Sequence, residues 1–239
     1  AGFALRDLAR QALHLLDDIP AQLRDYATGV RGQVRVFANI SSITQFLPAD
    51  LASFARAHPG VRIRLEESNS LDTVRAVEEN AADLGVYTAF AHGDGVQSLP
   101  YRGDRLCLVV PRRHPLAGAR PVAFRELLDE PFVGLRTGSA INLLLAGEAA
   151  RLGRTLRLSI QVTGFDALCL MVERGFGIGV VPEGVFRLYS AALELDTVAL
   201  HDDWARRELR LAVRHSAQLP AAAQRLLAHL QACAAGAAE

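Results

Sequence analysis

One order of elements occurs twice along the chain, and it constrains the fold more than any single motif. The first copy is a strand at 34–38, a loop rich in hydroxyl side chains, a helix over 51–57 and a strand at 61–66. The second copy spans residues 131–164 and has the same order: strand, hydroxyl-and-glycine loop, helix, glycine turn, strand. Such alternation predicts parallel sheets with right-handed crossovers. We therefore expect an α/β protein built from two similar halves.

The rest of the chain continues this alternation. Asn69 or Ser70 can cap one helix, and Asp166 can cap another that Gly175 closes in the left-handed conformation. The hydrophobic pattern predicts further strands at 84–87, 106–110, 178–181 and 207–214, and helices at 70–80, 166–174 and 222–233. The strand at 61–66 alternates apolar and charged residues, which predicts one buried face.

Bulk composition limits the classes of protein to which the chain can belong. It has 239 residues, half of them hydrophobic, and a formal net charge of zero. This length suffices for two small domains. A neutral chain argues against a nucleic-acid-binding surface spread over the whole molecule. No apolar run approaches the roughly 20 residues of a membrane span, so we expect no membrane partner.

The cysteines indicate a reducing compartment. Cys107, Cys169 and Cys233 all lie in apolar segments, and their number is odd. This pattern favours buried thiols over disulfides or redox use. We therefore predict free thiols and a cytoplasmic location.

An amphipathic helix is predicted at the N-terminus. Apolar residues recur at steps of three and four from Leu5 to Val30, which places them on one helix face. Pro20 interrupts this pattern, so we expect a kink or a restart there. The apolar stripe can pack on a second copy of the chain, on a domain absent from it, or on the chain's own core.

The first strand-to-helix turn carries hydroxyl side chains but no negative charge. Ser41, Ser42 and Thr44 supply neutral hydroxyls there, and no carboxylate is present. In open parallel sheets, ligands bind beyond the carboxyl ends of the strands, where helix N-termini offer free N–H groups and about half a positive charge. A turn without a carboxylate leaves room for an anion or a polar group.

The second half repeats this design. Thr137, Gly138 and Ser139 follow the strand at 132–135, and Arg136 beside them can supply positive charge. If the two halves face each other, the two turns meet across one cleft. Serine and threonine are also common helix caps, so two readings stay open: ligand contacts or caps alone. Asp166 is read mainly as a cap, at a turn on the same side.

Motifs for catalysis and metal binding are not found. The chain has no GxSxG, HExxH, CxxC or phosphate-loop signature, and its seven histidines are scattered. The segment "RGFGIGVV", residues 174–181, closes a helix and opens a strand, the reverse of a dinucleotide-binding motif. We expect no enzyme activity, no metal and no cofactor.

Several segments, taken in order, resemble the LysR-type transcriptional regulators. They are the helix that ends in glycines before "GQVRV", the hydroxyl turn with "FLP", "FARAHPGVRIRLEE", "ADLGVY", "LCLVVPRRHPLA" and "MVERGFGIGVVPEGV". The resemblance covers essentially the whole chain. It implies two Rossmann-like subdomains, as in type 2 periplasmic binding proteins, after an amphipathic linker helix, without the N-terminal winged helix-turn-helix.

The resemblance also implies boundaries and site residues. It makes residues 1–32 a linker and dimerisation helix, residues 33–103 with 210–239 subdomain I, and residues 104–209 subdomain II. It implies effector contacts at Ser41, Ser42, Thr88, Thr137, Gly138, Ser139, Phe165 and Asp166. Pro20 departs from an uninterrupted linker helix.

The function that the resemblance implies is sensing of a small, anionic or polar effector in the inter-subdomain cleft. The partners would be that effector, further copies of the chain in a dimer or tetramer, and DNA only through the N-terminal domain. The alternative is a periplasmic solute-binding protein of a transporter, which has the same two-lobed fold. The helix at 5–30 and the unpaired cysteines count against it.

Overall fold

The computed structural model describes residues 32–89, 95–216 and 219–236. The linker helix predicted for residues 1–32 lies outside them, except for Gly32, which opens a strand instead. Contacts divide the chain into two compact units, which are described separately below: residues up to Arg102 together with those from Glu208 onward, and Gly103–Arg207. The chain passes between the units in strand β4 (Gln97–Pro111) and again in strand β9 (Arg206–Val213).

The first unit contains a five-stranded mixed sheet in the order β2-β1-β3-β9-β4. Besides β4 and β9, its elements are β1 (Gly32–Ala38), α2 (Ile40–Gln45), α3 (Leu47–Ala57), β2 (Val61–Glu67), α4 (Ser70–Glu78), β3 (Leu84–Thr88) and α8 (Ala221–Gly236). Strand β1 runs parallel to both β2 and β3, and β9 runs antiparallel to β3. The parallel βαβαβ order predicted from the sequence is confirmed.

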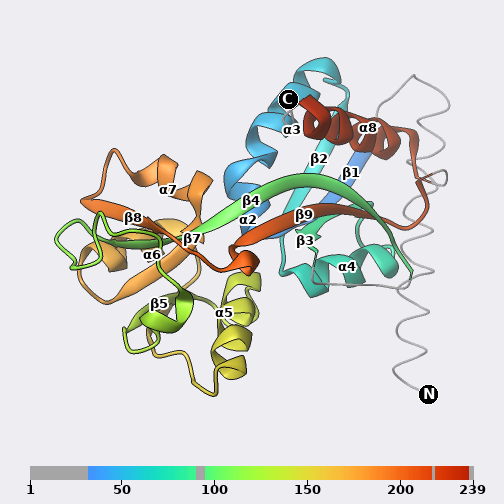
Figure 1. The fold of residues 1–239 in the computed structure, drawn as a ribbon. Helices are drawn as coiled ribbons and strands as arrows, with labels where there is room; N and C mark the ends of the chain where they lie inside the picture. The colour runs from blue at the N-terminus through green and yellow to red at the C-terminus, as the bar shows by residue number, and fades with distance from the viewer. Residues whose placement is uncertain (1–31, 90–94, 217–218, 237–239) are drawn as a thin grey trace. The chain divides into compact units, whose positions relative to one another are not determined.

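Helices cover both faces of this sheet (Figure 1). Val34 and Val36 of β1 point into a core with Phe54 of α3 and Leu226 of α8. Phe37 points to the other face, where α4 supplies the packing surface. A strand places successive side chains on opposite faces, so Gln33 and Arg35 share the face of Phe37, and only the face with Val34 and Val36 is fully buried.

Strand β2 departs from the one buried face that its alternation predicts. Val61 is buried, but Leu65 is 39% exposed. Since β2 lies at the end of the sheet order, only one neighbouring strand covers its backbone, and the core does not reach the distal half of the strand.

Helix α2 was not predicted. The hydroxyl residues were expected in a loop before a helix over 51–57, yet Ser41, Ser42 and Thr44 lie inside α2. Phe46 separates α2 from α3, and Pro48 lies within the first two positions of α3, where a missing N–H costs nothing. The proline therefore lies in the first turn of a second helix, α3, which follows α2 after a single residue.

The second unit has a sheet in which β4 pairs antiparallel with β7 and β8, while β5 pairs parallel with β6 and β7. Its further elements are the short 3-10 helices η1 (Phe124–Leu127) and η2 (Asp203–Ala205), with β5 (Phe132–Leu135), α5 (Ala140–Arg151), β6 (Leu158–Val162), α6 (Phe165–Glu173), β7 (Ile178–Pro182), α7 (Glu183–Tyr189) and β8 (Leu195–Ala199). The sequence pattern did not predict α7 or β8.

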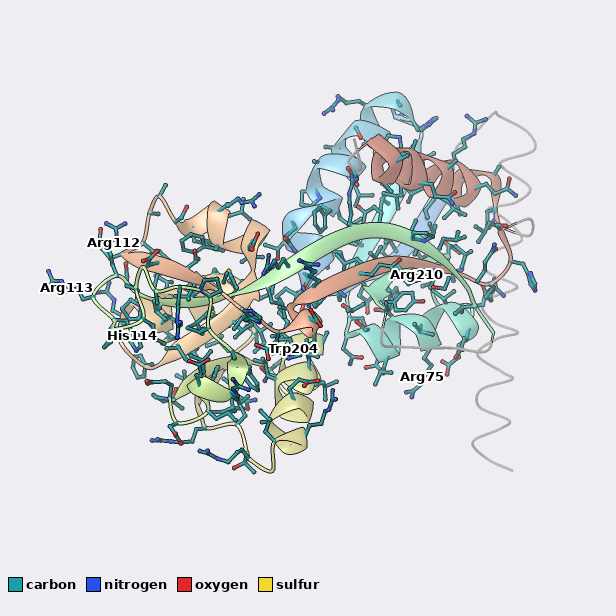
Figure 2. All side chains as sticks on the ribbon, viewed as in Figure 1. Arg75, Arg112, Arg113, His114, Trp204 and Arg210 are labelled. Atoms are coloured by element: carbon teal, nitrogen blue, oxygen red, sulfur yellow. The ribbon has the colours of Figure 1, made fainter. Side chains whose placement is uncertain are left out.

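Aromatic side chains fill much of the core of this unit. Phe124, Phe132 and Phe165 are almost completely buried. The ring of Trp204 on η2, labelled in Figure 2, lies edge-on to Phe124 with the ring centroids 5.4 Å apart. An edge-to-face pair of this kind adds to the burial of apolar area. It holds η2 against η1.

The thiols lie in two different settings. Cys107 and Cys169 are buried, whereas Cys233 is half-buried, which corrects the expectation that all three are buried. Burial raises the pKa of the thiols of Cys107 and Cys169 to about 12. Burial, and then the nearby Asp50, raises the pKa of the Cys233 thiol as well.

Thiol titration tests this arrangement. In denaturant without reductant we expect all three cysteines to react with a thiol reagent. In the native protein at pH 8 we expect negligible reaction at Cys107 and Cys169, because the thiolate is the reactive form and a pKa near 12 keeps it scarce. Fewer than three thiols in denaturant would indicate a disulfide and contradict the prediction.

Candidate functional site

The first strand-to-helix junction is organised by Asn39, which follows β1 directly. Its Oδ1 accepts a hydrogen bond from the backbone N–H of Ser42 at 3.0 Å and caps α2. Its Nδ2 donates to Thr88 Oγ1 at 3.0 Å and to Ser70 Oγ at 3.4 Å. Thr88 ends β3 and Ser70 opens α4. One amide, itself 4% exposed, thus connects the ends of two strands with the starts of two helices.

The predicted contacts of this unit lie around that amide. Ser41 and Thr88 are buried, Ser42 is 0% exposed, and Thr44 is half-buried. Ser42 Oγ donates to the carbonyl oxygen of Asn39 at 2.8 Å, with Asn39 Oδ1 at 2.9 Å. Contact between Ser42 and an effector would require its hydroxyl to leave these bonds. The structure therefore gives Ser42 a role in building the helix start.

Ser42→Ala tests that role. We expect the free energy of unfolding to fall by about 0.5–1.5 kcal/mol, because the buried hydroxyl loses its hydrogen bonds. Thr44→Ala, in the same short helix but half-buried, should change it by less than about 0.5 kcal/mol. Urea unfolding of both variants measures the difference. Equal losses would contradict the assignment.

The second junction follows β5. Ser139 caps α5, with its Oγ accepting from the backbone N–H of Asn142 at 3.2 Å. Asn142 in turn bonds both backbone groups of Leu135, the last residue of β5. Gly138 has φ +87°, a left-handed conformation that glycine adopts without strain. The sequence pattern indicated the cap but not Asn142, which fixes the start of α5 to the strand.

Charge differs among these helix starts. The first turns of α2 and α5 contain no acidic residue, whereas α4 has Asp72 and α6 has Asp166 there. The side chains of Arg136 and Thr137, just before α5, are exposed. An uncompensated helix N-terminus beside an arginine attracts anions. The second junction thus has the chemistry to hold a carboxylate or a phosphate.

The start of α6 corrects the cap predicted at Asp166. Gly164 is the N-cap residue, and Asp166 lies exposed in the first turn. Its carboxylate offsets the positive end of this helix, which makes it a weaker anion site than α5. The ring of Phe165 is 2% exposed and leaves almost no surface for a ligand. Both residues as effector contacts stay a prediction.

Away from the two junctions, the buried carboxylate of Asp50 makes structural hydrogen bonds and an ion pair. In the first unit, Asp50 accepts from Tyr101 at 2.6 Å and pairs with Arg102 at 3.0 Å, and burial raises the pKa of Tyr101. These bonds attach β4 to α3. Within the described residues no group of three or more His, Cys, Asp or Glu side chains could hold a metal ion. The geometry thus offers polar ligand contacts at strand ends.

Comparison with known proteins identifies the family. The model of the LysR substrate binding domain matches residues 27–234. The chain belongs to this family. The match extends over both strand-to-helix junctions described above.

A relative of this LysR domain is itself a transcriptional regulator. It is 28% identical over 187 residues to the RuBisCO operon transcriptional regulator of Allochromatium vinosum, covering 78% of the chain and 59% of that protein. The chain therefore spans less than two thirds of the length of that relative. Transcriptional regulation is a role that needs no catalysis.

Solved structures show the same fold. The effector binding domain of QuiR in complex with shikimate matches with a TM-score of 0.75 at 14% identity, covering 87% of this chain and 99% of that one. The regulatory domain of CcmR from Synechocystis PCC6803 in complex with 2-PG matches with a TM-score of 0.76 at 22% identity, covering 84% and 97%. At these identities the likeness establishes the fold of LysR effector-binding domains. In the described part of the chain, no helix has the length and apolar character needed to cross a membrane.

Proposed function

We propose that this chain is the effector-sensing and oligomerisation part of a bacterial LysR-type transcriptional regulator. In this proposal it works in the cytoplasm, catalyses no reaction, and binds a small anionic or polar metabolite. The observation that carries the proposal is the family match over residues 27–234. The same match favours a regulator over a periplasmic solute-binding protein.

The proposed effector contacts lie at the strand ends of each unit. They are Ser41, Ser42, Thr44 and Thr88 in the first unit, and Arg136, Thr137, Gly138, Ser139, Phe165 and Asp166 in the second. The carboxylate-free first turns of α2 and α5 support an anionic or polar effector. Exposure favours Thr137 and Arg136 as direct contacts, and burial favours Ser42 as an indirect one.

Signal transmission in this proposal is a population shift. A metabolite can shift an equilibrium between conformations only by as much as its affinities for them differ. Contacts made in one arrangement of the units and lost in another would supply that difference. DNA would be bound by a winged helix-turn-helix domain of the longer protein, and the effector would change how the two such domains of a dimer are placed.

Oligomerisation is assigned to the apolar stripe from Leu5 to Val30, which lies outside the described residues. We expect the full chain to be a dimer or tetramer, since an amphipathic helix without a partner would expose its apolar face. A chain that starts at Gln33 should have a lower mass. Light scattering measures both. A monomeric full chain, or equal oligomers, would contradict a role for this helix.

Native mass spectrometry tests the effector proposal. The chain is expressed in a bacterial cytosol, purified without denaturant, and its mass is compared before and after denaturation. We expect a released small molecule that binds again to the stripped protein in calorimetric titration. Purified protein that never carries a metabolite, and that takes up neither shikimate nor 2-PG at millimolar concentration, would contradict the proposal.

A matched pair of variants tests whether the second junction takes part in effector binding. Thr137→Ala removes a hydroxyl before α5, and Thr155→Ala removes a similarly exposed hydroxyl elsewhere in the same unit. A hydrogen bond to a charged group contributes about 1.5–3 kcal/mol, so Thr137→Ala should weaken binding of the released metabolite roughly tenfold to a hundredfold. Thr155→Ala should leave affinity unchanged. Equal affinities would remove Thr137 from the site.

A further inference from the structure

The side chain of Asn39 makes three hydrogen bonds, and the hydroxyl of Ser42 lies beside its oxygen. An amide side chain has two donor hydrogens and an acceptor oxygen with two lone pairs. Asn39 Nδ2 faces Thr88 Oγ1 and Ser70 Oγ, and Oδ1 faces the N–H and the hydroxyl of Ser42. Exchanging the amide N and O would place two donors opposite each other at the Ser42 N–H, so the orientation of the amide is determined.

The backbone around Asn39 is fixed as well. Its N–H donates to the carbonyl of Val86 at 3.0 Å, and the preceding carbonyl, of Ala38, accepts from Ser68 N at 2.9 Å. Ser70 Oγ also accepts from the N–H of Thr88 at 3.1 Å. The carboxyl ends of β1 and β3 and the start of α4 are therefore joined by one set of buried hydrogen bonds with Asn39 at its centre.

We propose that Asn39 is a positioning residue of the effector site. It holds the ends of β1 and β3 and the first turn of α4 in one arrangement, so that the candidate contacts of this junction, Ser41 and Thr88, are preorganised before a ligand arrives. Preorganisation improves affinity because the ordering of the site does not have to occur during binding. This inference rests on the proposed function, but the arrangement that it describes can be measured without a ligand.

Substitution can separate two roles of Asn39: the N-cap of α2, and the hydrogen bonds to Thr88 and Ser70. Asn39→Ser keeps a good N-cap side chain for α2 but is too short to reach Thr88 and Ser70. Asn69→Ser is the matched control. Asn69 caps α4 by accepting from the N–H of Asp72 at 2.9 Å, and its amide otherwise bonds only the neighbouring Asp72 carboxylate in the described structure. The same chemical change is therefore made at a helix cap that joins no other element.

Amide hydrogen exchange of the full chain, followed by NMR, is the deciding experiment. In Asn39→Ser we expect exchange at Thr88 and in the first turn of α4 to accelerate by about tenfold or more, because two buried hydrogen bonds are lost. In Asn69→Ser, exchange at Thr88 should remain as in the unaltered chain. Acceleration confined to α2 in Asn39→Ser would show that Asn39 is only a cap, and would overturn the proposal.

A second variant guards against a general loss of structure. Thr88→Val keeps the shape of the residue and the cap of α2, and removes the acceptor of the Asn39 amide. We expect faster exchange at Ser42 N–H, which Thr88 does not contact in the described bonds. Unchanged exchange there would overturn the proposal even if Asn39→Ser did not fold.

Titration of the same variants separates this inference from the proposed function. Shikimate and 2-PG are the probes. If the unaltered chain binds either, Asn39→Ser should raise its dissociation constant at least about tenfold over Asn69→Ser. Equal constants would overturn the positioning role. If neither probe binds the unaltered chain, the proposed function loses support, while the exchange data still decide the arrangement around Asn39.

Discussion

Replacing Arg207 with methionine should lower the free energy of unfolding by about 3–5 kcal/mol. Arg207 Nε donates to Asp104 Oδ1 at 2.9 Å, and its Nη2 donates to Oδ2. The two side chains are 4% and 3% exposed. Methionine fills a similar volume but leaves the Asp104 carboxylate buried without this counter-charge. Breaking one side of a buried pair is costly for this reason, whatever the net contribution of the intact pair.

Two further variants make the expected result specific. Arg112→Met breaks the ion pair between Arg112 and Glu194, whose two side chains are 56% and 74% exposed respectively. This change should lower the free energy of unfolding by about 0–1 kcal/mol. Arg112, labelled in Figure 2, directly follows β4. The double variant Arg207→Met with Asp104→Leu should recover most of the stability, since both charges of the buried pair are then removed. Urea unfolding measures all three. A loss in Arg207→Met no larger than in Arg112→Met would contradict the argument.

Replacing Gly177 with alanine should lower the free energy of unfolding by about 2–6 kcal/mol, the second large effect that we expect. Gly177 has φ +144°, and a Cβ there would lie 2.2 Å from the carbonyl oxygen of Pro131. That oxygen accepts from the N–H of Ile178 at 2.8 Å at the start of β7. Because the obstacle is the backbone of Pro131, directly before β5, it cannot move aside without straining this bond.

Gly175→Ala is the matched control for this strain. Gly175 also has a positive φ, +82°, but nothing lies within 4 Å of the position that a Cβ would take there. The substitution should cost only the left-handed conformation, about 1–2 kcal/mol. Calorimetric melting of both variants tests the comparison. Equal destabilisation at the two glycines would contradict a steric cause at Gly177.

The order of elements was predictable because it depends on local patterns. Short apolar runs and glycine turns marked β1, β3, β5 and β7, and Gly175 closes α6 in the left-handed conformation as predicted. The pattern missed α2 because its sequence is short and polar. Its helical state depends on Asn39 and on burial in the tertiary structure, which no local signal encodes.

The two strand-to-helix junctions were predictable in place but not in detail. Hydroxyl residues after a strand indicated both junctions, and Ser139 does cap α5. The sequence could not show that Ser42 has no exposed surface, or that Asn39 and Asn142 hold the junctions together. An asparagine directly after a buried strand is the signal that would have indicated Asn39. Asp166 was misplaced because any acidic residue near a helix start resembles a cap.

Hydrogen–deuterium exchange with the metabolite released from the purified chain tests the central claim most directly. The account predicts that saturating metabolite slows exchange in two separate segments, residues 39–45 and 136–142, and that Thr137→Ala weakens the effect in parallel with affinity. Protection of only one segment, or protection confined to other parts of the chain, would contradict the proposal that the effector contacts residues at both strand-to-helix junctions.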